Sequence, residues 1–232
     1  EVTLTDFDPE GEVKVVAAAL YAASDLPDDQ LLELARGMSA AERAEVLRAY
    51  VGERGNRRHK PGRAFERTAY RFDVLCDFGA FRDLQRHRML TLEWQRLTTR
   101  HGYETPPEVE DAGLLPEWTE VMEASARAEH ELLAAGLADA AQYAVAMAYR
   151  IRFVVQMNAR EAMHLTELRS QPQGHPVYRR VAQAMHRLIG EVHPAIGAAM
   201  SFVDHSRVEL ERLEAERRTE AKRRALEGGP AG

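Results

Sequence analysis

The sequence contains little cysteine and no long apolar run. Cys76 is the single cysteine among 232 residues, which excludes a disulfide framework and a cysteine-based zinc site and fits a reducing cytoplasm. No apolar run approaches the ~18 residues of a membrane-spanning helix, and no signal peptide is visible. We therefore expect a cytoplasmic protein with no membrane partner. Because the sequence starts at Glu1 and not at Met, we expect it to be part of a longer polypeptide.

Several common signatures of ligand binding are also missing. The sequence has no GxGxxG, GxxxxGK[ST], GxSxG or HExxH pattern, and its nine histidines form no carboxylate–histidine pair at metal-ligand spacing. We therefore expect no metal site. The net charge of −6 would repel a nucleic acid polymer, so any phosphate must bind in a local basic pocket.

Apolar periodicity predicts more helix than strand. Strand patterns occur at the start of the chain and at 68–76 and 151–157, and helical patterns occur at 12–23, 27–38, 78–88, 115–136, 138–149, 158–169 and 177–203. Ser39 and Glu42 form a capping box that starts a further helix, and 52–63 is typical of a basic loop. We predict an α/β (α+β) fold with a mixed sheet flanked by long helices. Residues 1–203 would form one domain, and 204–232 a charged C-terminal helix and flexible tail.

A basic cluster stands out within this acidic chain. It consists of Arg82, Arg86, His87, Arg88, Arg96 and Arg100. Apolar residues such as Phe81, Leu84 and Trp94 are interleaved with these cations, so the segment must be at least half buried. Arginine binds phosphate and carboxylate in a bidentate way and keeps its charge. Because solubility alone does not require cations beside a core, the cluster predicts an anion-binding site.

The segment NAREAMHLTELR, residues 158–169, adds a second group of polar side chains on one helix. Eleven residues make about three turns, so Asn158 and Arg169 lie nearly in line, while Arg160 and His164 share another face. The apolar strand 151–157 precedes this helix and would direct its N-terminus into the interior. Taken alone, the segment also fits an ordinary amphipathic helix.

Three blocks in this order resemble the flavin-dependent thymidylate synthases. FERTAYRF at 65–72 is similar to the family's Phe-Glu-His block, and RHR at 86–88 matches its signature triplet. MNAREAMHLTELR at 157–169 is similar to the family's Asn-x-Arg … His/Asn … Leu-Arg helix, with its spacing intact. The likeness runs from about Val2 to the helical region that ends near Val203.

The resemblance implies a homotetramer that methylates dUMP to dTMP in pockets shared between subunits. FAD would be the cofactor, methylenetetrahydrofolate would supply the methylene group, and NADPH would reduce the flavin. No cysteine nucleophile is needed for this chemistry, which agrees with the position of Cys76 on a strand. The basic cluster would then hold FAD and the nucleotide phosphate.

The resemblance also implies individual roles. FAD contacts would come from Glu66, Arg86, His87, Arg88, Asn158, Arg160 and His164. Nucleotide contacts would come from Arg82, Asp83, Arg100 and Arg169. Arg169 matches the arginine that faces the uracil, where a cation can stabilise negative charge that develops on the ring. Thr98 is the candidate for the family's active-site serine, in a loop two residues longer.

The substrate half departs from the family pattern more than the flavin half does. Arg96 stands at the unshifted serine position, Asp83 replaces a glutamine, Arg67 replaces a histidine, and Gln142 stands where a substrate arginine is expected. In the family's Ala-Gln-x-Glu-Ile-Arg segment, Arg179 alone is kept. Two alternatives therefore stay open: a methylase of another uridine nucleotide, and a non-catalytic flavin- or nucleotide-binding module. Either the substrate differs, or the chain is a divergent, partly degenerate member of the family, such as one half of a tandem chain.

Overall fold

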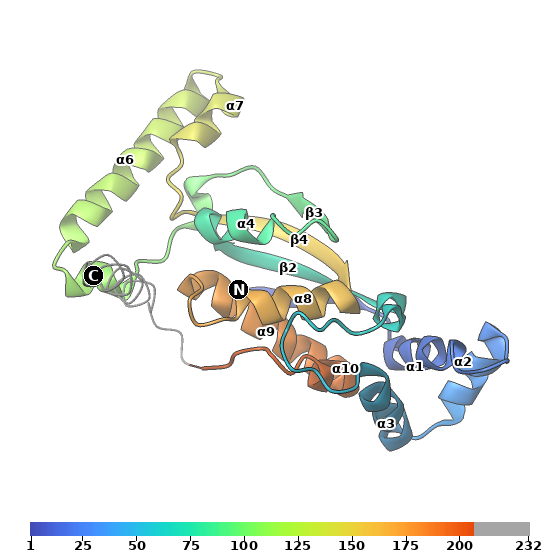
Figure 1. Cartoon of the computed structure of the whole chain (residues 1–232). Helices are drawn as coiled ribbons and strands as arrows, with labels where there is room; N and C mark the ends of the chain where they lie inside the picture. Colours follow the sequence, from blue (N-terminus) through green and yellow to red (C-terminus); the bar gives the residue numbers. More distant parts are fainter. Residues whose placement is uncertain (207–232) are drawn as a thin grey trace, which may run out of the picture.

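The computed structural model describes residues 1–206 and contains a four-stranded sheet (Figure 1). The strands are β1 (Val2–Phe7), β2 (Ala69–Asp77), β3 (Thr91–Trp94) and β4 (Arg150–Asn158), in the order β1-β2-β4-β3. Each described pair is antiparallel, so the expected mixed pairing is corrected. Buried and partly exposed residues alternate along β2 and β4. This alternation fits antiparallel pairing, because antiparallel sheets commonly bury one face and expose the other.

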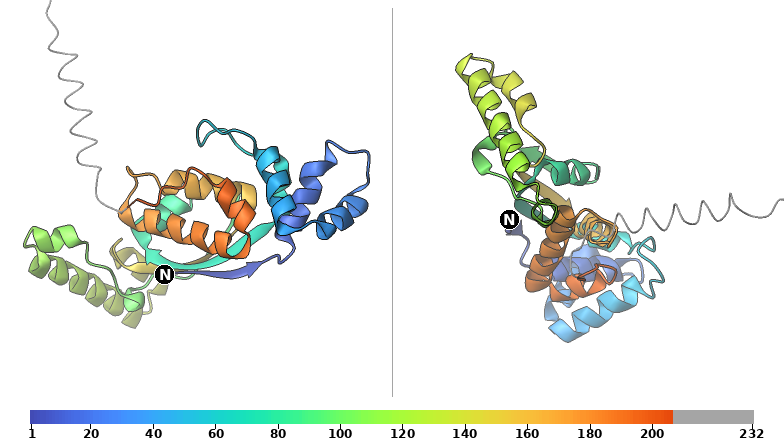
Figure 2. Two further views of the ribbon diagram at one scale, coloured as in Figure 1. Left: turned by 90° about the horizontal axis from the view of Figure 1, so that it is seen from below. Right: turned by 90° about the vertical axis from the view of Figure 1, so that its left-hand side faces the viewer.

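The buried face of the sheet forms the centre of the core. Tyr70, Phe72 and Val74 of β2 are fully buried, and β4 contributes Phe153 and Val155 directly opposite them. Helices α4 (Phe78–Leu84), α8 (Ala159–Arg169), α9 (Pro176–Val192) and α10 (Pro194–Ala199) follow these strands. Of these, α4, α8 and α9 pack against the sheet, while α10 packs on α9, and the views in Figure 2 show α8 and α9 on one side of it. The alternation of apolar and polar residues at 68–76 therefore correctly predicted a strand with one buried face.

Three helices form one end of the molecule. They are α1 (Gly11–Tyr21), α2 (Asp28–Gly37) and α3 (Ala40–Val51). The predicted capping box is confirmed, since Ser39 and Glu42 exchange hydrogen bonds at the start of α3. Gly11 allows α1 to approach α9, because a Cβ atom there would lie 2.4 Å from the His193 ring. The loop 52–62 and the 3₁₀ helix η1 (Arg63–Arg67) then lead into β2.

The opposite end is an arm that projects from the sheet (Figures 1 and 2). It contains α5 (Pro107–Asp111), α6 (Leu115–Ala134), α7 (Ala138–Ala141) and the 3₁₀ helix η3 (Gln142–Ala144), and the short 3₁₀ helix η2 (Thr99–His101) lies at its base. Within α6, Met122 and Glu129 are buried, while the rest of this helix is at least partly exposed. The sheet core therefore leaves most of the apolar side of α6 uncovered.

Three sequence-based boundaries are corrected by the structure. The helix expected at 78–88 ends at Leu84, so Arg86, His87 and Arg88 lie in the turn that precedes β3. The helix expected at 138–149 is reduced to α7 and η3. The helical pattern at 177–203 is interrupted at His193, since α9 ends at Val192 and α10 begins at Pro194. The tail predicted for 204–232 lies outside the described residues from 207 onward.

None of the helices that the structure describes combines the length and the apolar composition needed to cross a membrane.

Candidate functional site

A cluster of five side chains joins the turn after α4 to α8. It consists of Asp83, His87, Glu161, His164 and Arg169, which we call the histidine–arginine cluster. The Nε of Arg169 donates a hydrogen bond to Nε2 of His87 at 3.1 Å, and Nδ1 of His87 lies 2.8 Å from Oε1 of Glu161. The His164 ring stands edge-on to the His87 ring, 5.4 Å away. The structure thus brings together residues that are more than seventy positions apart in the sequence, such as His87 and Glu161.

The geometry of α8 places this cluster beyond the end of the inner strand β4. Asn158 ends β4 and caps α8, because its side-chain oxygen accepts a hydrogen bond from the Glu161 backbone N–H at 2.9 Å. An Asn at this position satisfies one of the unpaired N–H groups of the first turn. Arg169 closes the same helix three turns later, with its side chain 15% exposed. Asn158 and Arg169 therefore mark the two ends of α8, with the N-cap at one end and a mostly buried guanidinium at the other.

His87, Glu161 and His164 are also spaced as three metal ligands could be. One ligand atom from each lies within 4.8 Å of the other two. The contact with Arg169 argues against a cation, because a guanidinium is a donor and so requires a lone pair on His87 Nε2. Nδ1 then carries the proton that Glu161 accepts, and it offers no lone pair to a metal. The arrangement fits a hydrogen-bond chain better than a metal centre.

The surroundings of His164 are electropositive. Burial lowers the pKa of His164 below its usual range, and the charges of Lys60 and Arg57 lower that pKa further, whereas Glu161 opposes the shift. The loop 52–62 therefore brings cations close to α8. Arg160 connects the same loop to the helix, because its Nε donates to the Pro61 carbonyl at 3.0 Å.

Glu66 lies next to this helix as well. Its carboxylate is 3.3 Å from Nη1 of Arg160 and also pairs with the exposed Arg63. Hydrogen bonding to Arg63 lowers the pKa of Glu66, and the charge of Arg160 contributes to the same shift. The three predicted flavin residues Glu66, Arg160 and Asn158 are thus gathered around the start of α8.

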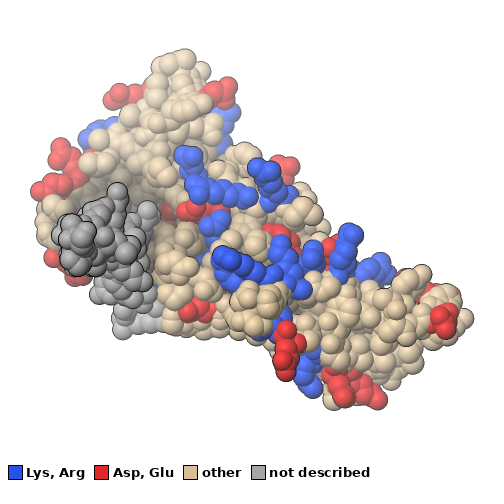
Figure 3. Space-filling view, viewed as in Figure 1, with Lys and Arg blue, Asp and Glu red and all other residues tan. Residues whose placement is uncertain are grey.

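The other two members of the basic triplet face solvent. Arg86 and Arg88 are exposed, and Arg86 pairs with Asp83 at 3.2 Å. Asp83 is also 4.0 Å from Nη1 of Arg169, so one carboxylate stands between two guanidinium groups. Figure 3 shows Lys and Arg side chains gathered across the middle of the face seen there. This local excess of cations in an acidic chain suits a phosphate-bearing ligand.

Thr98 and Arg100 belong to a second group, next to the arm. The Thr98 hydroxyl is buried and lies 3.4 Å from Nε of Arg100, and the backbone N–H of Thr99 donates to Glu129 at 3.0 Å. Burial alone would raise the pKa of Glu129, but the hydrogen bonds from Thr99 lower that pKa on balance. The described contacts of this group run to α6 and not to Arg169. Sequence reasoning missed Glu129, which carries no local signal within the helical pattern of α6.

Arg82 lies apart from Asp83, although the two are adjacent in the sequence. It lines a cavity of about 410 Å³ together with Trp94, Leu97 and Gln142. Gln142 accepts a hydrogen bond from the Leu97 backbone N–H at 3.1 Å, one residue before Thr98. Arg82 therefore supplies a cation to the cavity in which Gln142 replaces the expected arginine.

Two further departures from the family pattern, Arg96 and Arg67, have structural partners, and so has the retained Arg179. Arg96 pairs with Asp139 at 2.8 Å on the surface, and Arg67 pairs with Asp28. Arg179 is 1% exposed and donates to the Ser170 carbonyl at 2.9 Å, so it holds the turn between α8 and α9.

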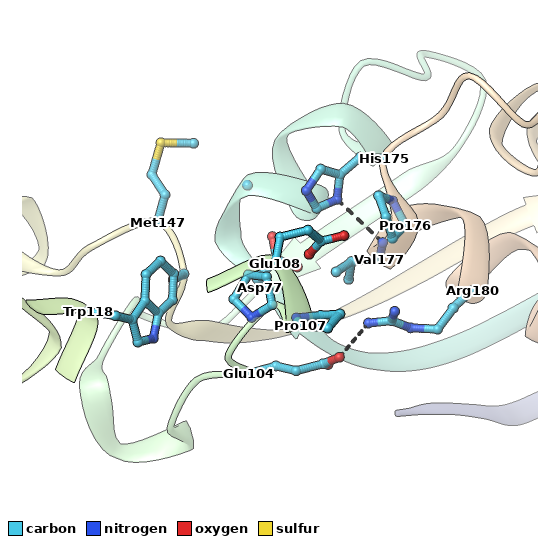
Figure 4. A pocket seen from close by; sticks show the side chains of 13 residues that line it. Asp77, Glu104, Pro107, Glu108, Trp118, Met147, His175, Pro176, Val177 and Arg180 are labelled. Atoms are coloured by element: carbon cyan, nitrogen blue, oxygen red, sulfur yellow. Dashed lines mark hydrogen bonds and ion pairs between the residues drawn. The ribbon is translucent and has the colours of Figure 1, made fainter. Parts of the chain in front are cut away.

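A further cavity, of about 310 Å³, lies between the arm and the start of α9 (Figure 4). Asp77, Glu104 and Glu108 line it together with Trp118, and Arg180 pairs with Glu104 at 2.7 Å. Burial raises the pKa of Asp77 above its usual range. Three carboxylates with one paired guanidinium would repel a phosphate, so this cavity does not suit a nucleotide.

Comparisons with known proteins bear on this arrangement. A family model described as thymidylate synthase complementing protein matches residues 3–195. A "UPF0159 protein" of Chlamydia muridarum (strain MoPn / Nigg) is 40% identical over 220 residues, which are 95% of this chain and 41% of that protein. A "UPF0159 protein" of Thermoplasma acidophilum is 37% identical over 210 residues, which are 90% of this chain and 42% of that protein. The chain thus spans less than half the length of these relatives.

The fold is also similar to that of a solved structure. The crystal structure of a UMP/dUMP methylase, PolB from Streptomyces cacaoi bound with 5-Br dUMP, aligns with a TM-score of 0.66 at 18% identity. The alignment covers 87% of this chain and 94% of that one. At this identity the likeness concerns the fold, whereas the family match extends over most of the sequence. The chain belongs to the thymidylate synthase complementing protein family, and this confirms its resemblance to the flavin-dependent thymidylate synthases.

Proposed function

We propose that the protein methylates dUMP to dTMP in an FAD-dependent reaction. Methylenetetrahydrofolate would supply the methylene group and NADPH would reduce the flavin. The family match and the fold of the UMP/dUMP methylase support this proposal. The observation that carries it is the hydrogen bond of Arg169 to His87, which joins the arginine expected at the pyrimidine to the triplet expected at the flavin.

The residues around the start of α8 fit FAD. Arg86 and Arg88 are exposed cations, and Asn158 uses its oxygen to cap the helix, so its amide N–H groups are left to donate. The N-terminus of a helix favours an anion, and Arg160 and neutral His164 flank it. These side chains would hold the phosphates and the ring system. When bound, FAD would supply the hydride chemistry that amino-acid side chains lack.

The chain's own contribution at the pyrimidine would come from Arg169. Its guanidinium is fixed by His87 on one side and lies over the Tyr178 ring, 5.5 Å from the ring centroid. A cation held in advance stabilises negative charge as it develops on the ring, without reorganisation during the reaction. Water is kept from this group by the packing around it, since Arg169 is 15% exposed.

We propose that Thr98 and Arg100 reach a nucleotide bound by another copy of the chain. Thr98 and Arg100 contact each other, and Thr99 between them donates to Glu129 on the arm, so one copy does not assemble them with Arg169. A homotetramer with shared pockets would do so. In the longer relatives, a second half of the same chain could supply the partner, since this chain matches 41% of such a protein.

Two observations favour alternatives. Asp83 stands beside Arg169, and its carboxylate can accept hydrogen bonds but cannot donate them. Gln142 lines the cavity of Arg82, where the family pattern has an arginine. Both changes would suit a uridine nucleotide other than dUMP. The displaced serine position at Thr98 would suit a module that binds flavin or nucleotide without turnover.

Flavin content tests the proposal most simply. The variant Arg86→Ala/Arg88→Ala removes two exposed side chains, so it should fold normally and lose bound FAD. Arg187→Ala, which removes another exposed arginine from α9, serves as the matched control and should keep its flavin. Full flavin occupancy in the folded double variant would contradict the assignment of 86–88 to FAD.

A further inference from the structure

Arg169, His87 and Glu161 form a linear chain of hydrogen bonds with one consistent assignment of protons. Arg169 Nε always donates, so Nε2 of His87 must accept, and the imidazole proton must sit on Nδ1. Nδ1 is 2.8 Å from Glu161 Oε1, which accepts this proton. The carboxylate thus selects the one tautomer of His87 that can accept from Arg169.

Glu161, at one end of this hydrogen-bond chain, is held in place by its surroundings. Glu161 is 9% exposed, and its backbone N–H is bound to the Asn158 side chain. Its carboxylate lies in the first turn of α8, where the helix dipole favours negative charge. His87 is equally buried, so the carboxylate and the imidazole keep their relative position without help from solvent.

We propose that Glu161 is a positioning residue for the reaction: acting through His87, it holds the Arg169 guanidinium in the orientation required at the pyrimidine. In this inference, the role of Arg169 at the pyrimidine rests on the proposed function. The hydrogen-bond chain from Glu161 through His87 to Arg169 does not. Asp83 lies 4.0 Å from Nη1 of Arg169, and the Tyr178 ring centroid lies 5.5 Å from Cζ. The chain from Glu161 holds a different atom of the guanidinium, Nε, through His87.

The expected effect is on turnover and not on nucleotide affinity. In Glu161→Ala, either tautomer of His87 becomes accessible, and an Nε2–H group would face the Arg169 donor. A displacement of about 1 Å can cost about 10²-fold in rate, so kcat should fall by about that factor while KM changes little. Glu161→Gln should keep most of the turnover, because its amide oxygen can still accept from Nδ1–H.

The test uses the full chain with ¹⁵N-labelled histidine and arginine. In the wild type, His87 should show a protonated Nδ1, and the Arg169 Nε–H should exchange slowly with water; the resonances are assigned by their loss in His87→Gln and Arg169→Lys. Glu161→Ala should mix the His87 tautomers and speed exchange at Arg169, and Glu161→Gln should restore both. Glu117→Ala removes an exposed carboxylate from the first turn of α6 and should change neither.

Three outcomes would overturn the inference. The first is a protonated Nε2 on His87 in the wild type, and the second is an unchanged tautomer and unchanged turnover in Glu161→Ala. The third is stoichiometric binding of Zn²⁺ that is lost in His164→Ala, since it would make the three side chains a metal site. If the NMR results agree but no nucleotide is methylated, the hydrogen-bond chain stands, the proposed function fails, and the positioning role falls with it.

Discussion

At the scale of single residues, one buried ion pair connects segments that are far apart in the sequence. Arg54 and Glu167 pair at 2.6 Å with side chains 4% and 2% exposed. Arg54 also donates to the Ala199 carbonyl, and Glu167 accepts from the Phe202 backbone N–H. The pair therefore ties the basic loop 52–62 to α8 and to the segment after α10. It lies outside the proposed site but holds the loop that makes the site electropositive.

Breaking this pair should be costly. Arg54→Met leaves the Glu167 carboxylate buried without its partner, which typically destabilises a protein by about 3–5 kcal/mol. Urea denaturation followed by circular dichroism measures the loss. Arg187→Met removes an exposed arginine paired within α9 and should change the stability little. Equal stabilities for the two variants would show that the buried pair is not a constraint on the fold.

Cys76 should be chemically inert in the folded protein. Burial raises the pKa of its thiol to about 12, so the thiolate is scarce at neutral pH. Iodoacetamide should leave the native protein unlabelled between pH 7 and 9 and label it fully once it is unfolded. Rapid labelling of the native protein would mean that β2 opens readily.

Sequence periodicity could predict which residues share a face of α8, but not what they contact. The pattern placed Asn158 and Arg169 nearly in line, but Asn158 is the extended N-cap before α8 and Arg169 is the last residue of that helix. Glu161 could not be recognised as the partner of His87, since that contact joins two segments far apart in the sequence. The position of Asn158 three residues before Glu161 was the available signal, because an N-cap fixes the first turn.

At the scale of elements, the N-terminus of α8 has both a structural role and a proposed functional role. The Asn158 cap stabilises the helix, and the same turn is expected to face FAD. These two roles predict different responses to substitution. A residue that keeps the cap but adds negative charge separates them.

Asn158→Asp should fold as stably as the wild type and bind FAD more weakly. Its carboxylate can still accept from the Glu161 N–H, but it would repel a phosphate. Asn158→Ala, in contrast, should lose about 1 kcal/mol of stability with the cap. Flavin absorbance and denaturation curves measured on both variants distinguish the two effects. Undiminished FAD affinity in Asn158→Asp would place the phosphates elsewhere.

The break between α9 and α10 should make stability depend on pH. Burial lowers the pKa of His193 below 6.5, although the Glu12 and Asp8 carboxylates oppose the shift. Neutral His193 accepts from the Tyr70 hydroxyl and donates to the Asp8 carbonyl. The unfolded chain therefore binds the proton more readily, and the contribution to stability is lost as pH falls through 6.5.

Denaturation midpoints between pH 7.5 and 5 test this linkage. The wild type should lose stability across this range, and His193→Gln should show a shallower dependence. Burial also lowers the pKa values of His164 and His186, so part of the dependence should remain. Identical slopes in both proteins would exclude His193 as a proton-linked group.

Element ends were the least predictable part of the fold. The apolar positions Phe78, Phe81 and Leu84 correctly indicated α4, but the helix ends at Leu84 although His87 is also buried. His87 reaches its buried position from the turn, where it contacts Glu161 and Arg169. The helix expected at 138–149 is short because Tyr149 turns inward, where its hydroxyl donates to the Met122 carbonyl. Such tertiary contacts outweigh local helical preference.

At the scale of the whole molecule, the arm carries apolar side chains that the described chain leaves uncovered. The side chains that are about half exposed or more are Leu114, Val121, Leu133, Leu137, Tyr143 and Met147. The helical region at 115–136 thus leaves a surplus of uncovered apolar surface. The region 177–203 does not share it, because Val181, Met185 and Ile189 of α9 pack into the core.

We expect these arm residues to pack in the proposed homotetramer, since exposed apolar patches often mark interfaces. Sedimentation at micromolar concentration should show a tetramer, and Val121→Glu should shift it toward smaller species. The exposed Glu120→Lys variant is the control for a change of charge at the same place. A stable wild-type monomer would contradict the assembly and leave Thr98 and Arg100 away from any shared pocket.

We propose that this chain methylates a pyrimidine nucleotide whose ring faces Arg169. Tritium release from dUMP labelled at C5, in the presence of FAD, methylenetetrahydrofolate and NADPH, tests this claim most directly, because methylation replaces that hydrogen. The wild type should release tritium, and Arg169→Ala should keep its flavin but slow the release by about 10²–10³-fold. If the flavin-loaded wild type releases no tritium from dUMP and methylates neither UMP nor dCMP, the protein is a binding module and the account is wrong.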